Sequence, residues 1–86
     1  ENSMRPERFP VYRKLANAHS VFRIESETAF SEVQRIGGRF AVFHIKAHTY
    51  PERLRIMDML EAADGSILPM DQAEFDVWLA KAQRPV

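Results

Sequence analysis

The segment VFRIESETAFSEVQRI, residues 21–36, is the stretch from which the fold of this chain is most directly predicted. Its first residues predict a short apolar strand. After Ser26 its apolar residues fall at the helical spacing i, i+3/i+4, i+7. The same order recurs near the end of the chain, where ILPM precedes DQAEFDVWLAKA at residues 67–82. In each copy a residue suited to a helix N-cap, Ser26 or Asp71, stands four places before a phenylalanine. The sequence therefore predicts two strand–helix units.

The ends of both helices carry ordinary capping signals. The first helix is predicted over residues 27–36 and ends at Gly37-Gly38, because Gly37 can adopt the left-handed conformation of a C-cap. The second begins after Asp71, and Glu74 three residues later suggests a capping box. Four apolar residues at helical spacing form its predicted buried stripe: Phe75, Trp78, Leu79 and Ala82.

Two further regions are predicted to form strands. Residues 11–24, VYRKLANAHSVFRI, are rich in aromatic and β-branched residues and predict a β-hairpin. Asn17 is the residue in its connection that tolerates a left-handed backbone. Residues 40–50, FAVFHIKAHTY, predict a strand because the odd-numbered positions from 41 to 47 are all apolar. Pro51 then ends this strand.

Residues 52–63, ERLRIMDMLEAA, are compatible with two structures. Propensity favours a helix, since Pro51 suits a first helical position and Gly65 could cap the end. Periodicity allows a strand, because Ile56 and the leucines alternate with charged residues, although Asp58 interrupts that pattern. Both alternatives stay open at this point.

These elements predict one α+β domain over residues 11–83. Its antiparallel sheet has four or five strands, and both helices pack on one face, in the order ββα then ββ(β)α. Residues 1–10 are expected to form an N-terminal tail, with residues 1–3 an addition ahead of a start at Met4, and residues 84–86 a C-terminal tail. The predicted core consists of apolar side chains from every element: Phe22, Ile24, Phe30, Val33, Phe43, Ile45, Leu60, Phe75, Trp78 and Leu79.

Composition narrows the classes of function. The 86 residues are 45% hydrophobic and 28% charged, as in ordinary globular domains rather than disordered chains. The absence of cysteine excludes disulfides, thiolate nucleophiles and cysteine-based metal sites. With no membrane-length apolar segment and no signal peptide in the sequence, we expect a cytoplasmic protein that does not bind membranes. Residues 1–50 carry a charge of +3 and residues 51–86 a charge of −3, which could orient a partner.

Candidate catalytic and metal-binding residues are few. His44 and His48 are four residues apart, but on a strand rising about 3.3 Å per residue they lie too far apart to share one ion. Asp58 could join them in an enzyme or metal protein, and Asp58 with Glu61 offers a carboxylate pair. Neither set comes with a nucleophile, glycine loop or oxyanion motif. The sequence therefore predicts no catalytic, cofactor-binding or metal-ligating residue and no cofactor.

Basic residues in the N-terminal half raise the alternative of a nucleic-acid-associated protein. Tyr12 and Phe22 lie among them as stacking candidates. Against this alternative, the isoelectric point is near 7 and acidic residues are interleaved. The basic residues concerned are Arg5, Arg8, Arg13, Lys14, Arg23, Arg35 and Arg39.

Three segments, YRKLANAHSVFRI, FSEVQRIGGRF and YPERLRIMDML, together resemble a family of short, uncharacterised bacterial α+β proteins with no assigned activity. The recurring features stand at Tyr12 to Phe22, at Ile36-Gly37 and at Pro51 to Met59. The resemblance covers residues 12–80 and implies that residues 54–60 form a strand. It adds no catalytic or binding residue. We therefore expect a small non-catalytic protein-interaction module that forms a homodimer or binds another protein.

Overall fold

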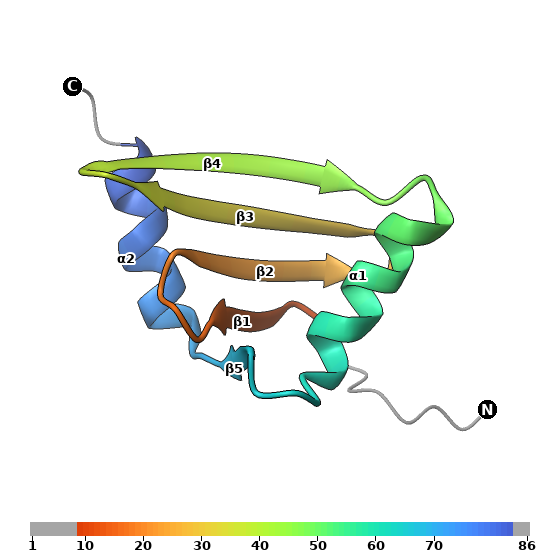
Figure 1. The fold of residues 1–86 in the computed structure, drawn as a ribbon. Helices are drawn as coiled ribbons and strands as arrows, with labels where there is room; N and C mark the ends of the chain where they lie inside the picture. Colours follow the sequence, from red (N-terminus) through yellow and green to blue (C-terminus); the bar gives the residue numbers. More distant parts are fainter. Residues whose placement is uncertain (1–8, 84–86) are drawn as a thin grey trace.

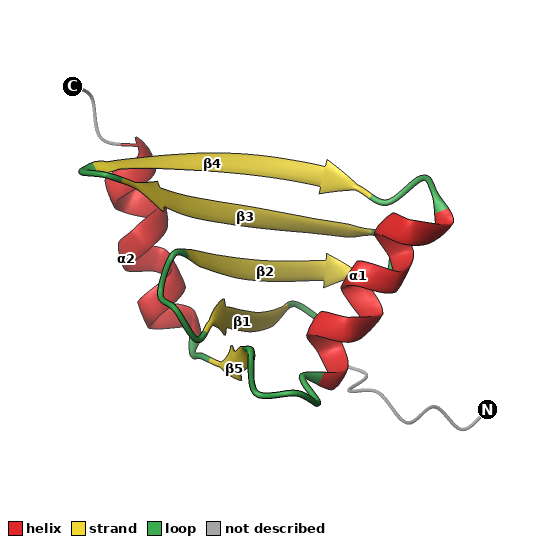
Figure 2. Ribbon diagram, viewed as in Figure 1, coloured by secondary structure: helices red, strands yellow, loops and turns green. Residues whose placement is uncertain are grey.

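The computed structural model describes residues 9–83, and this part of the chain folds as an α+β domain of five strands and two helices (Figures 1 and 2). All strand pairs are antiparallel, and the strand order across the sheet is β4-β3-β2-β1-β5. The predicted class is confirmed. Of the predicted tails, 1–10 and 84–86, residues 1–8 and 84–86 lie outside the described residues, and Phe9 packs against the hydrophobic core. In chain order the elements are β1 (Val11–Leu15), β2 (Ser20–Ser26), β3 (Ala29–Ile36), β4 (Arg39–Lys46), α1 (Tyr50–Glu61), β5 (Ile67–Pro69) and α2 (Gln72–Gln83).

The predicted first hairpin is confirmed as β1 and β2. Its register runs from Val11 opposite Ile24 to Lys14 opposite Val21. The left-handed residue of the connection is Ala18, with φ 64°, rather than Asn17. The Asn17 side chain stabilises the turn in another way, because its Oδ1 accepts the His19 N–H at 2.9 Å.

Residues 27–36 do not form the predicted helix but the strand β3. Ser26 Oγ accepts the Thr28 N–H at 3.1 Å, and this bond closes a two-residue turn rather than capping a helix. Because β3 lies inside the sheet with side chains covered on both faces, residues 30–33 are all buried and show no alternation of burial. The helix-like spacing of its apolar residues was therefore misleading.

The predicted strand at residues 40–50 is confirmed as β4 only as far as Lys46, because Tyr50 and Pro51 belong to α1 and Pro51 does not end the strand. It pairs with β3 along its whole length, from Ala29 opposite Lys46 to Ile36 opposite Arg39. Gly37 and Gly38 form the connecting turn, in which Gly37 has φ +61°. A positive φ at the first central residue is a feature of hairpin turns that match the twist of the strands.

The ambiguous segment forms α1, so the strand implied for residues 54–60 is wrong. Thr49 caps the helix: its side chain accepts the Glu52 N–H at 3.4 Å, and Glu52 Oε1 accepts the Thr49 N–H at 3.2 Å. Pro51 occupies the first turn, as propensity predicts. The helix ends at Ala62 in the left-handed conformation, φ 49°, and not at Gly65.

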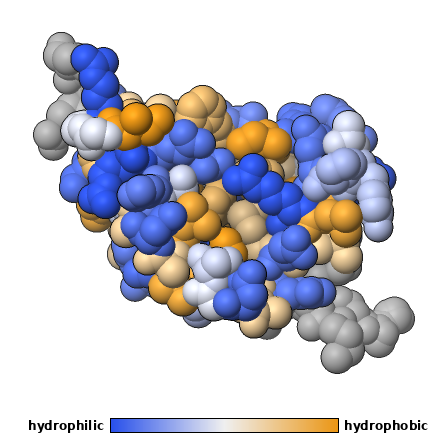
Figure 3. Space-filling model, in the orientation of Figure 1, coloured by the Kyte–Doolittle hydropathy of each residue, from blue (hydrophilic) through white to orange (hydrophobic). Residues whose placement is uncertain are grey.

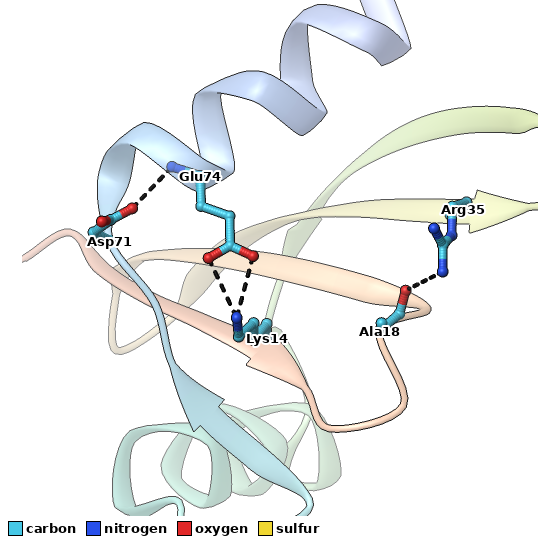
Figure 4. Close-up of polar contacts among 5 residues, drawn as sticks. All are labelled: Lys14, Ala18, Arg35, Asp71 and Glu74. Carbon is cyan, nitrogen blue, oxygen red and sulfur yellow. Dashed lines mark hydrogen bonds and ion pairs between the residues drawn. The ribbon is translucent and has the colours of Figure 1, made fainter.

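The second predicted helix is confirmed as α2. Asp71 Oδ1 accepts the Glu74 N–H at 2.9 Å (Figure 4). The Glu74 carboxylate does not complete a capping box, since it binds Lys14 Nζ of β1 at 3.2 Å. The predicted stripe is also confirmed, because Phe75 is fully buried and Trp78, Leu79 and Ala82 pack around it.

The two helices lie on opposite faces of the sheet, which corrects the prediction that both pack on one face (Figure 1). We call the face that carries α1 the front face and the face that carries α2 the back face. Successive residues of a strand point to opposite faces, so Phe22 and Ile24 meet α1 while Val21 meets α2. Both sets are buried, which requires a helix on each side.

Each helix crosses a different end of the strands (Figure 1). The front cluster joins side chains of α1 to β1, β2 and β3: Val11, Phe22, Ile24, Phe30, Ala47, Ile56, Met59 and Leu60. The back cluster contains Val21, Val33 and Phe75, with Tyr12, Phe40, Val42 and Trp78 packed against it. Of the predicted core, six residues are buried, and Ile45, Trp78 and Leu79 are partly buried and pack against the two clusters. Phe43 is 43% exposed and does not belong to the core.

Candidate functional site

Strand β4 is an edge of the sheet, and no strand of residues 9–83 pairs with its outer side. It is eight residues long, whereas β5 at the opposite edge has three residues and ends in Pro69. An edge strand presents a row of unpaired backbone N–H and C=O groups, to which another strand can bind. The short, proline-containing β5 is protected against such pairing, and β4 is not.

The two faces of β4 differ in how they are covered. On the back face Phe40 packs edge-on against Trp78 of α2, with ring centroids 5.4 Å apart, and Val42 lies beside it. On the front face Ile45 packs against the α1 cluster, but Phe43 is 43% exposed. Ile36, next to the β3–β4 turn, is 63% exposed. Apolar surface on the front of β3 and β4 is therefore left uncovered.

A polar chain crosses the back face beyond α2. Ser31 Oγ donates to Glu25 Oε2 at 2.6 Å and lies 2.9 Å from His44 Nδ1. Arg23 Nε binds the same Glu25 oxygen at 3.1 Å. Because the hydroxyl proton is donated to Glu25, His44 Nδ1 must carry a proton and donate it to Ser31.

This chain does not have the order of a catalytic triad. In a triad the imidazole lies between the nucleophile and the carboxylate, whereas here the serine lies between the carboxylate and the imidazole. Ser31 is also fully buried, so no substrate can reach its hydroxyl. The arrangement instead links β2, β3 and β4 through their side chains.

The sequence also suggested an enzyme or metal protein built on His44, His48 and Asp58. The structure does not bring these three residues together. His44 belongs to the back face and Asp58 lines a cavity on the front face. The His48 backbone N–H, beyond the end of β4, donates to Glu52 Oε1 at 2.9 Å. In the described part of the chain, no group of three or more His, Asp or Glu side chains could hold a metal ion.

Most of the described basic residues proposed for nucleic-acid binding have partners within residues 9–83. Arg13 donates to the Met59 and Leu60 carbonyls at 3.0 and 3.2 Å and so caps the end of α1. Its burial lowers the pKa of the Arg13 guanidinium. Arg35 donates to the Ala18 carbonyl at 3.1 Å (Figure 4) and stacks over Trp78.

Of the remaining described basic residues of that hypothesis, only Arg39, exposed at the start of β4, has no side-chain hydrogen bond or ion pair among residues 9–83. Lys14 and Arg23 have carboxylate partners, Glu74 and Glu25. Tyr12 packs against Phe75 with ring centroids 5.6 Å apart, and Phe22 is 1% exposed, so neither ring is available for stacking on bases. Arg5 and Arg8 lie outside the described residues.

A cavity of about 350 Å³ opens on the front face beside α1. Its apolar lining comes from four buried or half-buried side chains: Leu15, Phe22, Met59 and Ile67. Exposed charged side chains surround them: Arg55, Asp58, Glu61 and Asp64. Figure 3 shows hydrophobic residues set into the middle of this face with hydrophilic residues around them. Asp58 and Glu61 were candidates from the sequence, as a carboxylate pair and, for Asp58, with the two histidines. Asp64 was not a candidate, because only the loop after α1 brings it to the cavity.

Comparison with known proteins gave no match: no family model, no curated protein and no solved structure is similar to this chain. The resemblance to a bacterial family stays a prediction. Neither α1 nor α2, the helices of the described residues, is long and apolar enough to cross a membrane.

Proposed function

We propose that this domain is a non-catalytic protein-interaction module that forms a homodimer by pairing β4 with β4 of a second copy. The observation that carries the proposal is the long edge strand β4, whose outer side pairs with no strand of residues 9–83 and whose Phe43 is 43% exposed. Pairing would satisfy the outward backbone groups and cover the front of β4 in one step.

A two-fold axis through Phe43 gives a consistent register. The two Phe43 side chains then lie opposite each other on a continuous front face, and aromatic cross-strand pairs stabilise a sheet. In this register Lys46 faces Phe40 of the second copy, so the basic ends of β4 do not oppose each other. A shift that placed Arg39 opposite Lys46 would bring like charges together and is disfavoured.

Small size supports the same proposal. A chain of 86 residues buries a limited fraction of its surface, and an added interface contributes stability that a small core does not provide. On the back face of β4, Phe40 and Val42 already pack against the cluster that contains Phe75 of α2, so the gain on pairing comes mainly from the strand edge and the front face.

Sedimentation velocity of the wild type and of Phe43→Glu tests the proposal. We expect the wild type to sediment with twice the 10.0 kDa mass of the chain, and Phe43→Glu to sediment as a monomer. The carboxylates of the variant would lie opposite each other at the centre of the interface. Far-UV circular dichroism would check that the variant is folded.

Leu68→Glu is the matched control, because Leu68 is a partly exposed apolar residue on the other edge strand, opposite Lys14. It should remain dimeric. A monomeric wild type at high concentration would contradict the proposal, as would equal dissociation of the two variants.

A further inference from the structure

We infer that the cavity beside α1 is a docking site for a basic, apolar segment of a partner protein. An arginine or lysine of that segment would lie among Asp58, Glu61 and Asp64, and a neighbouring apolar side chain would contact the apolar lining. This site is separate from the proposed dimer interface, because β5 and β4 are opposite edges of the sheet.

The charges around the cavity do not cancel. Arg55 is the basic residue of the lining, and its guanidinium lies 3.6 Å from Glu32 Oε1 and over the rings of Phe22 and Phe30. Glu32 is 5% exposed, so Arg55 serves as the partner of this buried carboxylate. The remaining carboxylates around the cavity therefore constitute an excess of negative charge.

These carboxylates have no cationic partner in the part of the chain that the structure describes. Among residues 9–83, neither Asp58 nor Glu61 has an ion pair or a side-chain hydrogen bond. Asp64 Oδ1 accepts two hydrogen bonds from Ser66, from the N–H at 3.0 Å and the hydroxyl at 2.7 Å, and these lower its pKa. Asp64 is therefore ionised at neutral pH. The cavity presents negative charge that a cation can neutralise.

The shape of the site favours an organic cation over a metal ion. The carboxylates do not converge on one point, since no three acidic or histidine side chains of the described chain could hold a metal. They extend from the last turn of α1 into the following loop, beside the apolar side chains of Phe22 and Met59. Arginine and lysine combine an apolar stem with a charged head, and a stem against this lining leaves the head at the carboxylates. A segment with an apolar residue next to the cation covers more of the lining than a single amine.

The probe is the peptide acetyl-Leu-Arg-Leu-amide, titrated into ¹⁵N-labelled full-length protein. We expect chemical-shift changes concentrated in residues 55–67, and binding that weakens as salt is added. The same peptide with citrulline in place of arginine keeps the shape and loses the charge. It should bind about tenfold more weakly, since each partly exposed ion pair contributes a modest amount.

The variant Asp58→Asn/Glu61→Gln removes two exposed charges and should weaken binding of the arginine peptide about tenfold. Asp76→Asn, on an exposed position of α2, is the matched control and should leave binding unchanged. Equal binding of the citrulline peptide, or equal weakening by Asp76→Asn, would overturn the proposal. If phenethylammonium bound as tightly as the peptide, the partner would be a small amine, and a protein segment would be the wrong occupant.

Discussion

At the scale of residues, hydrogen bonds accepted by a single carboxylate fix the start of α1. Glu52 Oε1 accepts the N–H of His48 at 2.9 Å and that of Thr49 at 3.2 Å. The Thr49 N–H has no other acceptor among residues 9–83, whereas the His48 N–H also donates to the Lys46 carbonyl at 3.1 Å. These bonds to the ionised form lower the pKa of Glu52 below its ordinary value of 4.5.

The lowered pKa predicts a pH dependence of stability. The contribution of Glu52 to the free energy of unfolding is complete above its ordinary pKa, and it is lost as pH falls through the lower pKa of the folded state. The free energy of unfolding, measured by urea denaturation, should therefore change less with pH in Glu52→Gln than in the wild type between about pH 5 and pH 3. Glu61→Gln, at the other end of α1, should keep the wild-type slope. Parallel curves for Glu52→Gln and the wild type would show that the cap does not act through this charge.

Local signals at single residues were readable from the sequence. Asp71 was identified as a cap, and its carboxylate does accept the Glu74 N–H, because the bond depends only on residues three apart. Ser26 was also identified as a capping residue, but its hydroxyl closes a turn instead. The same short-range hydrogen bond serves both structures, so the residue alone does not decide between them.

At the scale of elements, β3 differs most from the sequence prediction. As a helix, residues 27–36 would bury Phe30, Val33 and Ile36 together on one side. As a strand, they bury Phe30 on the front face and Val33 on the back face, while Ile36 is 63% exposed. Neighbouring strands on both sides and helices on both faces decide the outcome, and none of these is visible in the segment itself.

This difference is measurable by substitution. Phe30→Ala should lower the free energy of unfolding by about 3–5 kcal/mol, because it removes a buried aromatic side chain. Ile36→Ala should change it by no more than about 0.5 kcal/mol, as expected for an exposed position. Urea denaturation of both variants in dilute solution provides the comparison. A large loss at Ile36 would contradict the strand assignment and match the helix.

In α1, unlike in β3, the local signals of the sequence agree with the structure that forms. The apolar positions of α1 allowed a strand, yet strong local signals, Pro51 in the first turn and the Thr49–Glu52 capping box, favour the helix that forms. Propensity and capping agreed here, and the resemblance that implied a strand at residues 54–60 did not outweigh them.

At the scale of the whole molecule, the arrangement of layers could not be derived from the sequence. The patterns indicated an α+β domain with an antiparallel sheet, and this is what the chain forms. They did not indicate that a helix lies on each face, because that depends on which strands are central. Phe43 was assigned to the core from its alternation, but only the strand order shows that it lies on an uncovered edge.

The two candidate sites, like the arrangement of layers, could not be derived from the sequence. β4 is an edge because no other strand of residues 9–83 pairs beyond it, and the acidic cavity forms where segments distant in the sequence meet. No local motif marks either of them. The charge difference between the two halves of the sequence is also a difference between two places in the fold. Arg39 and Lys46, from the half with a charge of +3, belong to β4. The half with a charge of −3 supplies the carboxylates around the cavity: Asp58, Glu61 and Asp64.

The most direct measurement of the central proposal is hydrogen exchange of the β4 amides at high and low protein concentration. If β4 pairs with β4 of a second copy, its outward N–H groups should exchange slowly at high concentration and rapidly on dilution. The amides of β2, which lies inside the sheet, should exchange slowly at both concentrations. Rapid exchange of the outward β4 amides at both concentrations would contradict the proposal, because the edge would then be open to solvent in the self-associated and the dilute protein alike.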